Sequence, residues 1–538
     1  MTVWGVAAPL VSGYRRLADR ELLACSAILA LTLGLRAALL PWLSVPQPAL
    51  HDEFSYLLAA DTYAHGRLTN PQHPFWQHFE TFHVLQQPTY ASKYQPMQGL
   101  VMAFGQKFFG EPWIGVYLST GFMCAAICWM LQGWIAPEWA LLGAVLCTLR
   151  LGVLSYFMNS YSGGSVAGFG GALALGALAR ILWRKQFGHS ITWAVGLSVL
   201  VLSRPYDAAV LGCATAAILG WFLFKYHTPL RSVVRSVAFP ALTVFAICAA
   251  AVAYNDYRVT GCALALPYQV NEQQYAMVSV FALIPFRPQP VYRHEILRQY
   301  WVDWQIGVWK RDRSHPLLVR LINFYLFDNF FFPFWALTIP LLIWPYDLHT
   351  EQERATVFLL LVFVLAMSLL IAALPHYAAA FTGVVYVRFL ESLKRLWSWQ
   401  PAGRPVGRAL GILLAGLLLG ELCINLFAPV TRSDMITRSF AEFGSRFKTA
   451  RRSITQVLEK QPGRQLVLVR YGPQHELLFD EWVYNRANID ASPIVWAREM
   501  NPAQDRPFLE YFRDRKVWLL EPDQSPPKLS RYPSVGKP

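Results

Sequence analysis

Charged residues are scarce in this 538-residue chain. Asp, Glu, Lys and Arg together make up 15% of the sequence, whereas hydrophobic residues make up 55% and aromatic residues 14%. A soluble globular protein carries roughly 25% charged residues. The composition therefore excludes an ordinary cytosolic enzyme, a disordered chain and a nucleic-acid-binding module, and it indicates long apolar segments.

Several familiar signatures are also missing. The eight cysteines form neither a disulfide framework nor a zinc pattern, and all but Cys262 lie in apolar stretches. Cys124 and Cys128 are spaced for one helix face, where packing explains them. No internal repeat is visible, which counts against the inverted-repeat transporter folds.

Long hydrophobic runs account for the low charge. A bilayer core about 30 Å thick needs roughly 20 apolar residues per helix. The first run is not a cleaved signal peptide, because no small-residue cleavage site comes before Pro41 and Trp42. We therefore expect a polytopic α-helical membrane protein with about 11 transmembrane helices. The expected spans are 21–43, 113–134, 138–156, 163–183, 191–203, 205–224, 236–254, 319–344, 355–374, 377–397 and 408–428.

The net charge of +14 is explained by orientation rather than by a nucleic-acid partner. Lys and Arg gather in alternate short loops, as the positive-inside rule requires of cytoplasmic loops. The pattern predicts a multi-pass protein of the cytoplasmic (inner) membrane with a cytoplasmic N-terminus. Three large segments, 44–112, 255–318 and the tail 429–538, then lie on the periplasmic or extracytoplasmic side. The basic residues behind this prediction are Arg15, Arg16, Arg20, Arg180, Arg184, Lys185, Lys225, Arg231, Arg235, Lys394, Arg395, Arg404 and Arg408.

The tail 429–538 differs from the transmembrane part, residues 1–428, because it has no span, no cysteine and many charges. Short apolar runs alternate with helical patterns, which predicts a small soluble α/β domain with a parallel sheet. No glycine-rich phosphate loop follows a strand, so we assign this domain no cofactor. The expected strands are Leu466–Val469, Ile494–Trp496 and Val517–Leu520, and the expected helical connections are 476–484 and 503–513.

Adjacent carboxylates mark the start of the first outer segment. Asp52 and Glu53 adjoin a membrane boundary, where charges are costly unless they are hydrated, paired or bound. They suit the unpaired amides of a first helical turn, so Asp52 could cap a helix over 53–65. A capping carboxylate at the membrane surface can also act as a base, and both interpretations stay open.

Histidines and aromatic residues follow in the same segment. His73, His78 and His83 could be read as a metal site, but their spacing does not repeat a helical pattern, and surface or interfacial histidines are favoured. An amphipathic stretch is expected at 97–109. The aromatic density is typical of a loop that lies on lipid headgroups.

The order of these features carries a resemblance. In sequence they are Asp52-Glu53 with Tyr56 three residues later, a polar and aromatic stretch, Lys93-x-x-Pro96, and an amphipathic helix ending in Phe-Phe-Gly at 108–110. This ordered set resembles the GT-C membrane glycosyltransferases. The likeness is closest to the protein O-mannosyltransferase and aminoarabinose transferase branch, whose loop typically reads Asp-Glu early and Lys-Pro-Pro late. Motifs support it over the first 110 residues, and topology supports it over the rest.

The resemblance implies an inverting transfer of a sugar from a polyprenyl-phosphate donor to an acceptor hydroxyl on the outer face. It implies Asp52 as the catalytic base, with Glu53 orienting it or contacting the sugar, and Lys93 as the cation for the donor phosphate. The chemistry agrees, because a carboxylate must accept the hydroxyl proton and cations must neutralise the departing lipid phosphate. The expected partners are the lipid-linked sugar and membrane lipids, while the acceptor can be a glycan, a lipid or a protein.

Two departures from the family pattern bear on this site. Gln95 replaces the first proline of the usual pair, and 155–165 has no carboxylate where the family often has one. The cofactor is therefore unknown: a divalent metal is compatible with the sequence but not required by it.

Residues at the outer ends of other spans are expected to line the same cavity. Arg204 is a second candidate for the donor phosphate, because a guanidinium binds phosphate through two parallel hydrogen bonds; alternatively, Arg204 and Asp207 simply pair and snorkel. His376 either meets the phosphate or is structural. The cavity candidates are His51, Tyr56, Tyr94, Asn159, Tyr161 and Asp207.

Two other functions compete with a transferase. A multi-span transporter or lipid-sugar flippase should carry charges deep in several helices, and only Arg36 and the 204–207 cluster resemble that. An assembly or sensor protein would work through 429–538. The segment 255–318 is expected to cover the cavity as a partly helical lid, with aromatic residues and arginines that suit either sugar rings or lipid headgroups.

Overall fold

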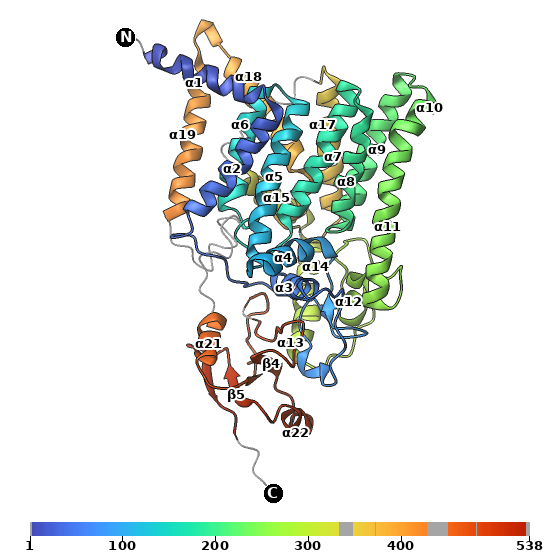
Figure 1. The fold of residues 1–538 in the computed structure, drawn as a ribbon, viewed down its shortest axis with the longest axis vertical. Helices are drawn as coiled ribbons and strands as arrows, with labels where there is room; N and C mark the ends of the chain where they lie inside the picture. Colours follow the sequence, from blue (N-terminus) through green and yellow to red (C-terminus); the bar gives the residue numbers. More distant parts are fainter. Residues whose placement is uncertain (1–2, 333–347, 372, 428–449, 480, 534–538) are drawn as a thin grey trace.

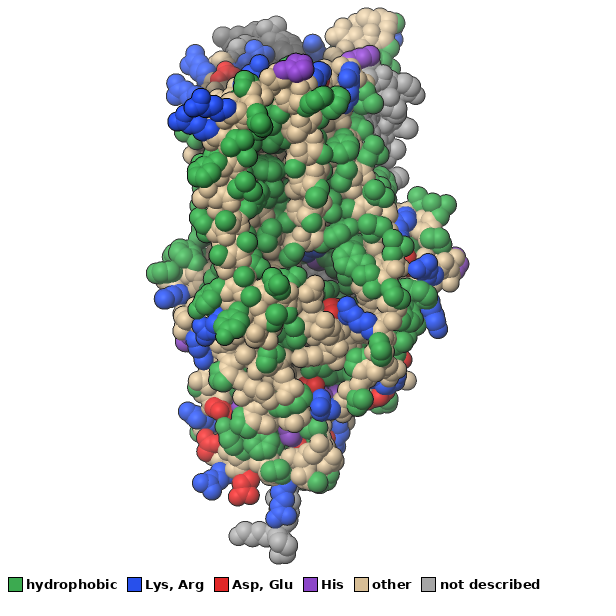
Figure 2. Space-filling view, turned by 90° about the vertical axis from the view of Figure 1, so that its right-hand side faces the viewer, with side chains coloured by type: hydrophobic (Ala, Val, Ile, Leu, Met, Phe, Trp, Pro, Cys, Tyr) green, Lys and Arg blue, Asp and Glu red, His purple; other side chains and the backbone are tan. Residues whose placement is uncertain are grey.

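The computed structural model describes residues 3–332, 348–371, 373–427, 450–479 and 481–533. A bundle of long helices forms one layer, and two outer segments and a small α/β domain stack on one end of it (Figure 1). Helix α1 (Val3–Ala18) lies at the opposite end of the bundle. Hydrophobic side chains cover the bundle, whereas charged side chains gather at its top and over the lower half of the view (Figure 2). This distribution suits a membrane-spanning bundle.

A helix is present at each expected span. Six helices of the described part are long and apolar enough to cross a membrane, so a polytopic helical protein is confirmed, whereas the count of eleven crossings is not. Parts of three expected spans, at 333–347, 372 and 428, lie outside the described residues. The helices are α2 (Glu21–Ala38), α5 (Trp113–Trp134), α6 with η2 (Pro137–Cys147, Thr148–Leu154), α7 (Gly164–Arg184), α8 (Ser190–Val201), α9 (Pro205–Lys225), α10, η4 and α11 (Leu230–Val233, Val234–Ala238, Phe239–Thr260), α15 (Pro316–Phe331), α17 (Glu351–Ser368), α18 (Thr382–Ser398) and α19 (Val406–Phe427).

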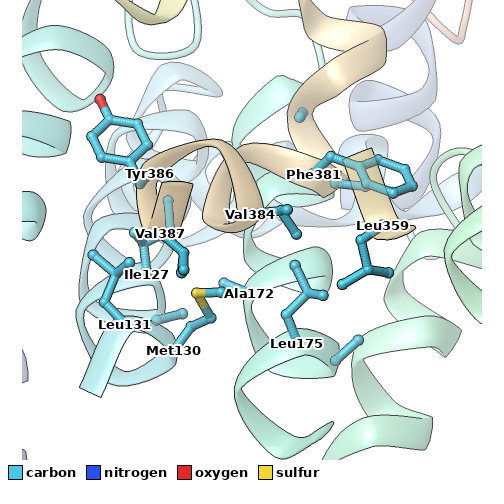
Figure 3. Packing of buried hydrophobic residues seen from close by; sticks show 14 of the residues in the cluster. Ile127, Met130, Leu131, Ala172, Leu175, Leu359, Phe381, Val384, Tyr386 and Val387 are labelled. Atoms are coloured by element: carbon cyan, nitrogen blue, oxygen red, sulfur yellow. The ribbon is translucent and has the colours of Figure 1, made fainter. Parts of the chain in front are cut away.

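Small residues allow α7 to pack closely inside the bundle. A Cβ atom at Gly171 would stand 2.0 Å from the carbonyl oxygen of Ala380 in η7 (Pro375–Phe381), so only glycine fits at this contact. Around it, apolar side chains fill the space between helices, with Leu175 pointing toward Val384 (Figure 3). Close approach of this kind drives helix association in lipid, where burial of apolar surface alone gives little.

Both outer segments are partly helical and lie at the same end of the bundle (Figure 1). The predicted helices at 53–65 and 97–109 are present as α3 and α4, and the partly helical character expected for 255–318 is confirmed. The first segment contains α3 (His51–Ala64), η1 (Trp76–Phe79), the antiparallel strands β1 (Val84–Leu85) and β2 (Ala91–Ser92), and α4 (Pro96–Phe109); the second contains α12 (Pro267–Tyr275), α13 (Glu295–Arg298), η5 (Gln299–Trp304) and α14 (Gln305–Ser314).

The tail forms the predicted α/β domain. Its sheet has the strand order β4-β3-β5-β6, in which the first three strands are parallel, as expected, and β6 adds an antiparallel edge that the sequence analysis did not predict. The predicted helix at 503–513 is present as α22. The elements are α21 (Ala450–Glu459), β3 (Gln465–Val469), β4 (Ile494–Arg498), α22 (Pro502–Tyr511), β5 (Lys516–Glu521) and β6 (Lys528–Arg531).

The helical connection predicted at 476–484 is wrong. Its described residues, which exclude 480, form an irregular loop with no helix. The carboxylate of Glu481 accepts the backbone N–H groups of Trp482 (3.0 Å) and Val483 (2.9 Å), so these donors are satisfied without a helical ladder.

The tail packs directly on the first outer segment. Ala487 donates its backbone N–H to Asp61 of α3 (2.8 Å), and the Tyr484 hydroxyl donates to the carbonyl of Phe82 (3.0 Å). A single apolar cluster joins the two parts. From the first segment it includes Phe54, Leu58, Phe79, Val84 and Tyr90, and from the tail Leu466, Leu468, Tyr484, Val495, Ala497, Phe508 and Phe512. The expected boundary at 428/429 lies outside the described residues, and the division into domains stays a prediction.

His73, His78 and His83 are buried, so their interpretation as surface residues is wrong. His73 lies 3.1 Å from Asp490, and His78 lies 3.2 Å from Asp505; both partners belong to the tail. His83 faces the candidate site described below. The sequence pattern could not reveal this burial, because the covering domain is more than 400 residues away along the chain for both pairs.

Candidate active site

Asp52 lies in the first turn of α3, and its side chain is 36% exposed. The Tyr94 hydroxyl donates a hydrogen bond to Asp52 Oδ1. Tyr94 is itself held by Tyr56, one helical turn beyond Asp52, because the two rings stack with centroids 4.4 Å apart. Three residues that the sequence analysis singled out are thus brought together.

Glu53 points the other way, into the protein. Its Oε2 accepts the backbone N–H groups of Ala49 (2.8 Å) and Leu50 (3.0 Å), and its Oε1 accepts that of Tyr161 (3.0 Å). Glu53, not Asp52, therefore satisfies the free amides at the start of α3. Since the cap uses Glu53, the neighbouring Asp52 carboxylate is left for another role.

Lys93 is buried beside a carboxylate that the sequence analysis did not select. Its Nζ lies 3.7 Å from Oε1 of Glu272 in α12, and both side chains are almost completely buried. The aromatic rings of Tyr268, Trp301 and Tyr94 surround the ammonium, with centroids at 4.5, 5.3 and 5.5 Å. Burial lowers the pKa of Lys93, while Glu272 and Asp52 oppose this effect.

Arg204 stands at the start of α9, where its guanidinium donates to Asp207 and lies 4.3 Å over the ring of Tyr377. The ion pair between Arg204 and the buried Asp207, one of the two interpretations of this cluster, is therefore observed. His376 is engaged by the Tyr156 hydroxyl, 2.8 Å from its Nδ1. The phosphate roles of Arg204 and His376 stay predictions.

The electrostatics connect these groups. Burial raises the pKa of Asp52, and the hydrogen bond from Tyr94 and the charges of Lys93 and Arg204 counteract it. Residues 52, 93 and 204 are distant in the sequence, yet the two basic side chains act on one carboxylate. The arrangement offers a carboxylate with raised proton affinity that is under the electrostatic influence of two cations, which is suitable for removing a hydroxyl proton near an anion.

Three other predicted cavity residues make structural contacts, and their roles in a cavity stay predictions. The Asn159 side chain accepts from Arg36 Nε (3.0 Å) and donates to the carbonyls of its own turn. The Tyr161 hydroxyl donates to the carbonyl of Pro46. His51 stacks on Phe82 at 4.2 Å, and burial lowers its pKa to about 3, so its ring is neutral.

His83 is a site residue that the sequence analysis assigned elsewhere. Its Nε2 lies 3.4 Å from Asp52 Oδ1 and 3.3 Å from the Tyr300 hydroxyl. Its backbone has a φ of 60°, a left-handed value that is uncommon outside glycine. Its carbonyl accepts both the Ser55 hydroxyl (2.7 Å) and the backbone N–H of Lys93 (3.2 Å), so His83 connects α3 to Lys93, the residue that follows β2. No periodic signal marks this residue in the sequence.

The sequence is compatible with a bound divalent metal but does not require one. In the described ranges, no three His, Cys, Asp or Glu side chains converge in a way that could hold a metal ion. The identity of any metal or cofactor therefore stays open.

No protein-family model matches the sequence, and no curated protein matches it. Solved structures do match. The oligosaccharyltransferase of Archaeoglobus fulgidus in complex with Zn and sulfate superposes with a TM-score of 0.52 at 13% identity, covering 93% of this chain and 67% of that chain. AglB from the same organism, in complex with an inhibitory peptide and a dolichol-phosphate, gives 0.51 at 12% identity, with 93% and 69% covered.

A third similar structure is ArnT from Cupriavidus metallidurans in the apo state, with a TM-score of 0.48, 10% identity and 93% of each chain covered. At identities this low, similarity establishes the fold, and the two archaeal structures, whose scores exceed 0.5, show it. The resemblance carried by the first outer segment is confirmed at this level. The chain has the polytopic helical fold of the GT-C membrane glycosyltransferases.

Proposed function

We propose that this protein is an inverting glycosyltransferase that moves a sugar from a polyprenyl-phosphate donor to an acceptor hydroxyl at the outer face of the membrane. The observation that carries the proposal is the position of Asp52, a partly exposed carboxylate whose proton affinity responds to both Lys93 and Arg204. The shared fold adds support, because the similar AglB structure holds a dolichol-phosphate.

The reaction is a single displacement at the anomeric carbon. The acceptor oxygen attacks this carbon, its proton passes to Asp52, and the bond from the carbon to the phosphate oxygen breaks with its electron pair on the phosphate. One base without a covalent sugar intermediate gives inversion. Tyr94 and His83 both approach Oδ1 of Asp52, so Oδ2 is the oxygen we assign to the acceptor proton.

Lys93 and Arg204 would neutralise the phosphate that departs. A fixed cation stabilises developing charge most strongly where water is excluded, and the three rings around Lys93 provide such an environment. Glu53 contributes by holding the start of α3 and the turn at Tyr161, which makes it a positioning residue in this proposal.

The membrane orientation follows from the charges. We infer that the end of the bundle with α1 faces the cytoplasm. Arg15 and Arg16 lie in the last turn of α1, and basic residues at the ends of membrane helices are typical of the cytoplasmic side. The outer segments and the tail would then face the periplasm. Arg36, a charge of the kind that a transporter would carry within its helices, has a structural role: it donates to Asn159 and to the carbonyls of Leu43 and Ser44.

A transfer assay tests the proposal. Purified full-length protein is incubated with membranes and with a set of radiolabelled undecaprenyl-phosphate sugars that includes a hexose, a pentose and an amino sugar. We expect the wild type to release undecaprenyl phosphate from at least one donor and Asp52→Asn to lose at least 100-fold in rate. Asp303→Asn, which removes a 53% exposed carboxylate of the second outer segment, should keep full activity. No release from any donor by the wild type contradicts the transferase, and equal rates for wild type and Asp52→Asn contradict the base.

A further inference from the structure

Glu272 stands between Lys93 of the candidate site and Arg287, a residue of the same outer segment as Glu272. Its Oε1 is 3.7 Å from Lys93 Nζ, and its Oε2 is 3.8 Å from Arg287 Nη1. Both separations are longer than an ordinary hydrogen bond. In the described part of the chain, Arg287 Nη1 is buried and has no hydrogen-bond partner. One carboxylate therefore lies between two cations, with one oxygen near each. It forms no hydrogen bond of ordinary length with either cation.

A phosphate group would be a stronger partner for these two cations than the carboxylate is. It offers more oxygens and greater charge to the same donors, and guanidinium and ammonium groups form their strongest hydrogen bonds with such anions. The aromatic rings around Lys93 exclude water, so its ammonium needs an anionic partner whether or not a ligand is present. Without a ligand, Glu272 is that partner.

We propose that Glu272 is an internal counter-anion that the lipid phosphate must displace from Lys93 and Arg287, and that it thereby weakens retention of the spent lipid. This inference rests on the proposed function for the class of ligand. The donor is a phosphodiester with one negative charge, whereas the product is a phosphomonoester with about −1.5 to −2 charges at neutral pH. A fixed carboxylate therefore repels the product more than the donor, and Glu272 favours exchange of product for fresh donor.

Direct binding of undecaprenyl phosphate to the purified full-length protein tests this inference without knowledge of the sugar or the acceptor. Glu272→Gln keeps the shape of the side chain and removes its charge. We expect this variant to bind undecaprenyl phosphate about 10-fold more tightly, and to turn over more slowly because the product leaves late. If Glu272 only held Lys93 in place, its neutralisation would weaken binding. Unchanged or weaker binding by Glu272→Gln overturns the inference.

Matched variants complete the test. Glu295→Gln removes a 64% exposed carboxylate from the same outer segment and should bind like the wild type. Glu272→Asp keeps the charge and should also stay near the wild-type affinity, so tighter binding in this variant would contradict the assignment. Lys93→Met should bind at least 10-fold more weakly, and the gain from Glu272→Gln should be lost in the double variant, since both changes act on one ion pair.

The transfer assay distinguishes failure of the counter-anion inference from failure of the transferase proposal. Sugar transfer by the wild type, together with unchanged lipid binding in Glu272→Gln, refutes the counter-anion and leaves the transferase intact. Tighter binding in Glu272→Gln, without transfer from any donor, refutes the transferase and supports a phosphate site with an internal competitor. Absence of undecaprenyl phosphate binding to the wild type refutes both.

Discussion

Tyr94 donates its hydroxyl hydrogen to Asp52, a residue 42 positions earlier in the chain. The tyrosine is kept in this position by the ring of Tyr56, which stacks on it. Hydrogen bonding to the charged form of a carboxyl favours ionisation, so this contact counteracts the burial that raises the pKa of Asp52. Tyr94, held by Tyr56, therefore fixes the orientation of the Asp52 carboxylate and lowers its proton affinity.

Removal of the hydroxyl in Tyr94→Phe should move the acid limb of the pH–rate profile to higher pH. The sign follows from the role of Asp52 as a base: its pKa rises when the hydrogen bond is lost, and the protonated carboxyl is inactive. Rates of the variant and the wild type should converge at high pH. Measurement of kcat/KM from pH 4 to 9 checks this, with Tyr511→Phe on the tail surface as control. A uniform loss at every pH would contradict it.

His83 should affect the chemical step rather than donor binding. Burial lowers its pKa well below the ordinary value, so the ring is neutral and can donate from Nε2 toward Asp52. We expect His83→Ala to lower kcat about 10- to 100-fold, because the Asp52 carboxylate would no longer be held in position to accept the proton. The KM for the donor should change little. His83→Gln, which keeps a donor, should recover part of the loss. A raised KM at constant kcat would assign His83 to binding instead.

The contact between the tail and the first outer segment depends on Arg498. Its guanidinium donates to the carbonyl of Glu80 and pairs with the fully buried Glu481 at 3.1 Å. Arg498→Met leaves Glu481 without its cation and should destabilise the protein by about 3–5 kcal/mol. Thermal unfolding in detergent measures the loss, and adding Glu481→Gln should restore part of it. Arg470→Met, which breaks a pair at the surface, should cost about 1 kcal/mol or less.

Gly171→Ala tests the packing of α7. The added methyl group would meet the backbone of Ala380, which cannot move aside as a side chain can, and we expect a cost of about 1–3 kcal/mol. Gly220→Ala in α9 is the matched control, because nothing lies within 4 Å of the new atom. Alanine should there stabilise the helix slightly. Equal melting temperatures of the two variants would contradict the assigned contact.

The bundle was the most predictable part of the molecule. The expected span 113–134 coincides with α5, and 163–183 differs from α7 by one residue at each end. A membrane helix must satisfy every backbone polar group with hydrogen bonds inside its own segment. Its hydrophobic sequence pattern is therefore contained in one continuous run of residues. The number of crossings is less predictable, because several helices are short or amphipathic.

The site was only partly predictable. Asp52 and Lys93 could be selected because they belong to an ordered motif within one segment. Glu272 could not, and the contact of Trp301 with Lys93 was not foreseen either, since both residues reach Lys93 from another outer segment and no local pattern links residues so far apart. The formation of the cap by Glu53 rather than Asp52 was also hidden, because the capping geometry depends on which carboxylate faces the preceding amides.

The apolar cluster that joins the first outer segment to the tail has a consequence for biosynthesis. A ribosome completes α3 and the stretch up to Tyr90 long before it completes β3, β4 and α22, so the apolar side chains of the early segment stay uncovered until these later elements reach the same side of the membrane. The candidate site therefore cannot mature while only the N-terminal helices have been made. A chain interrupted before β3 would leave α3, which carries Asp52, without the apolar surface that covers it.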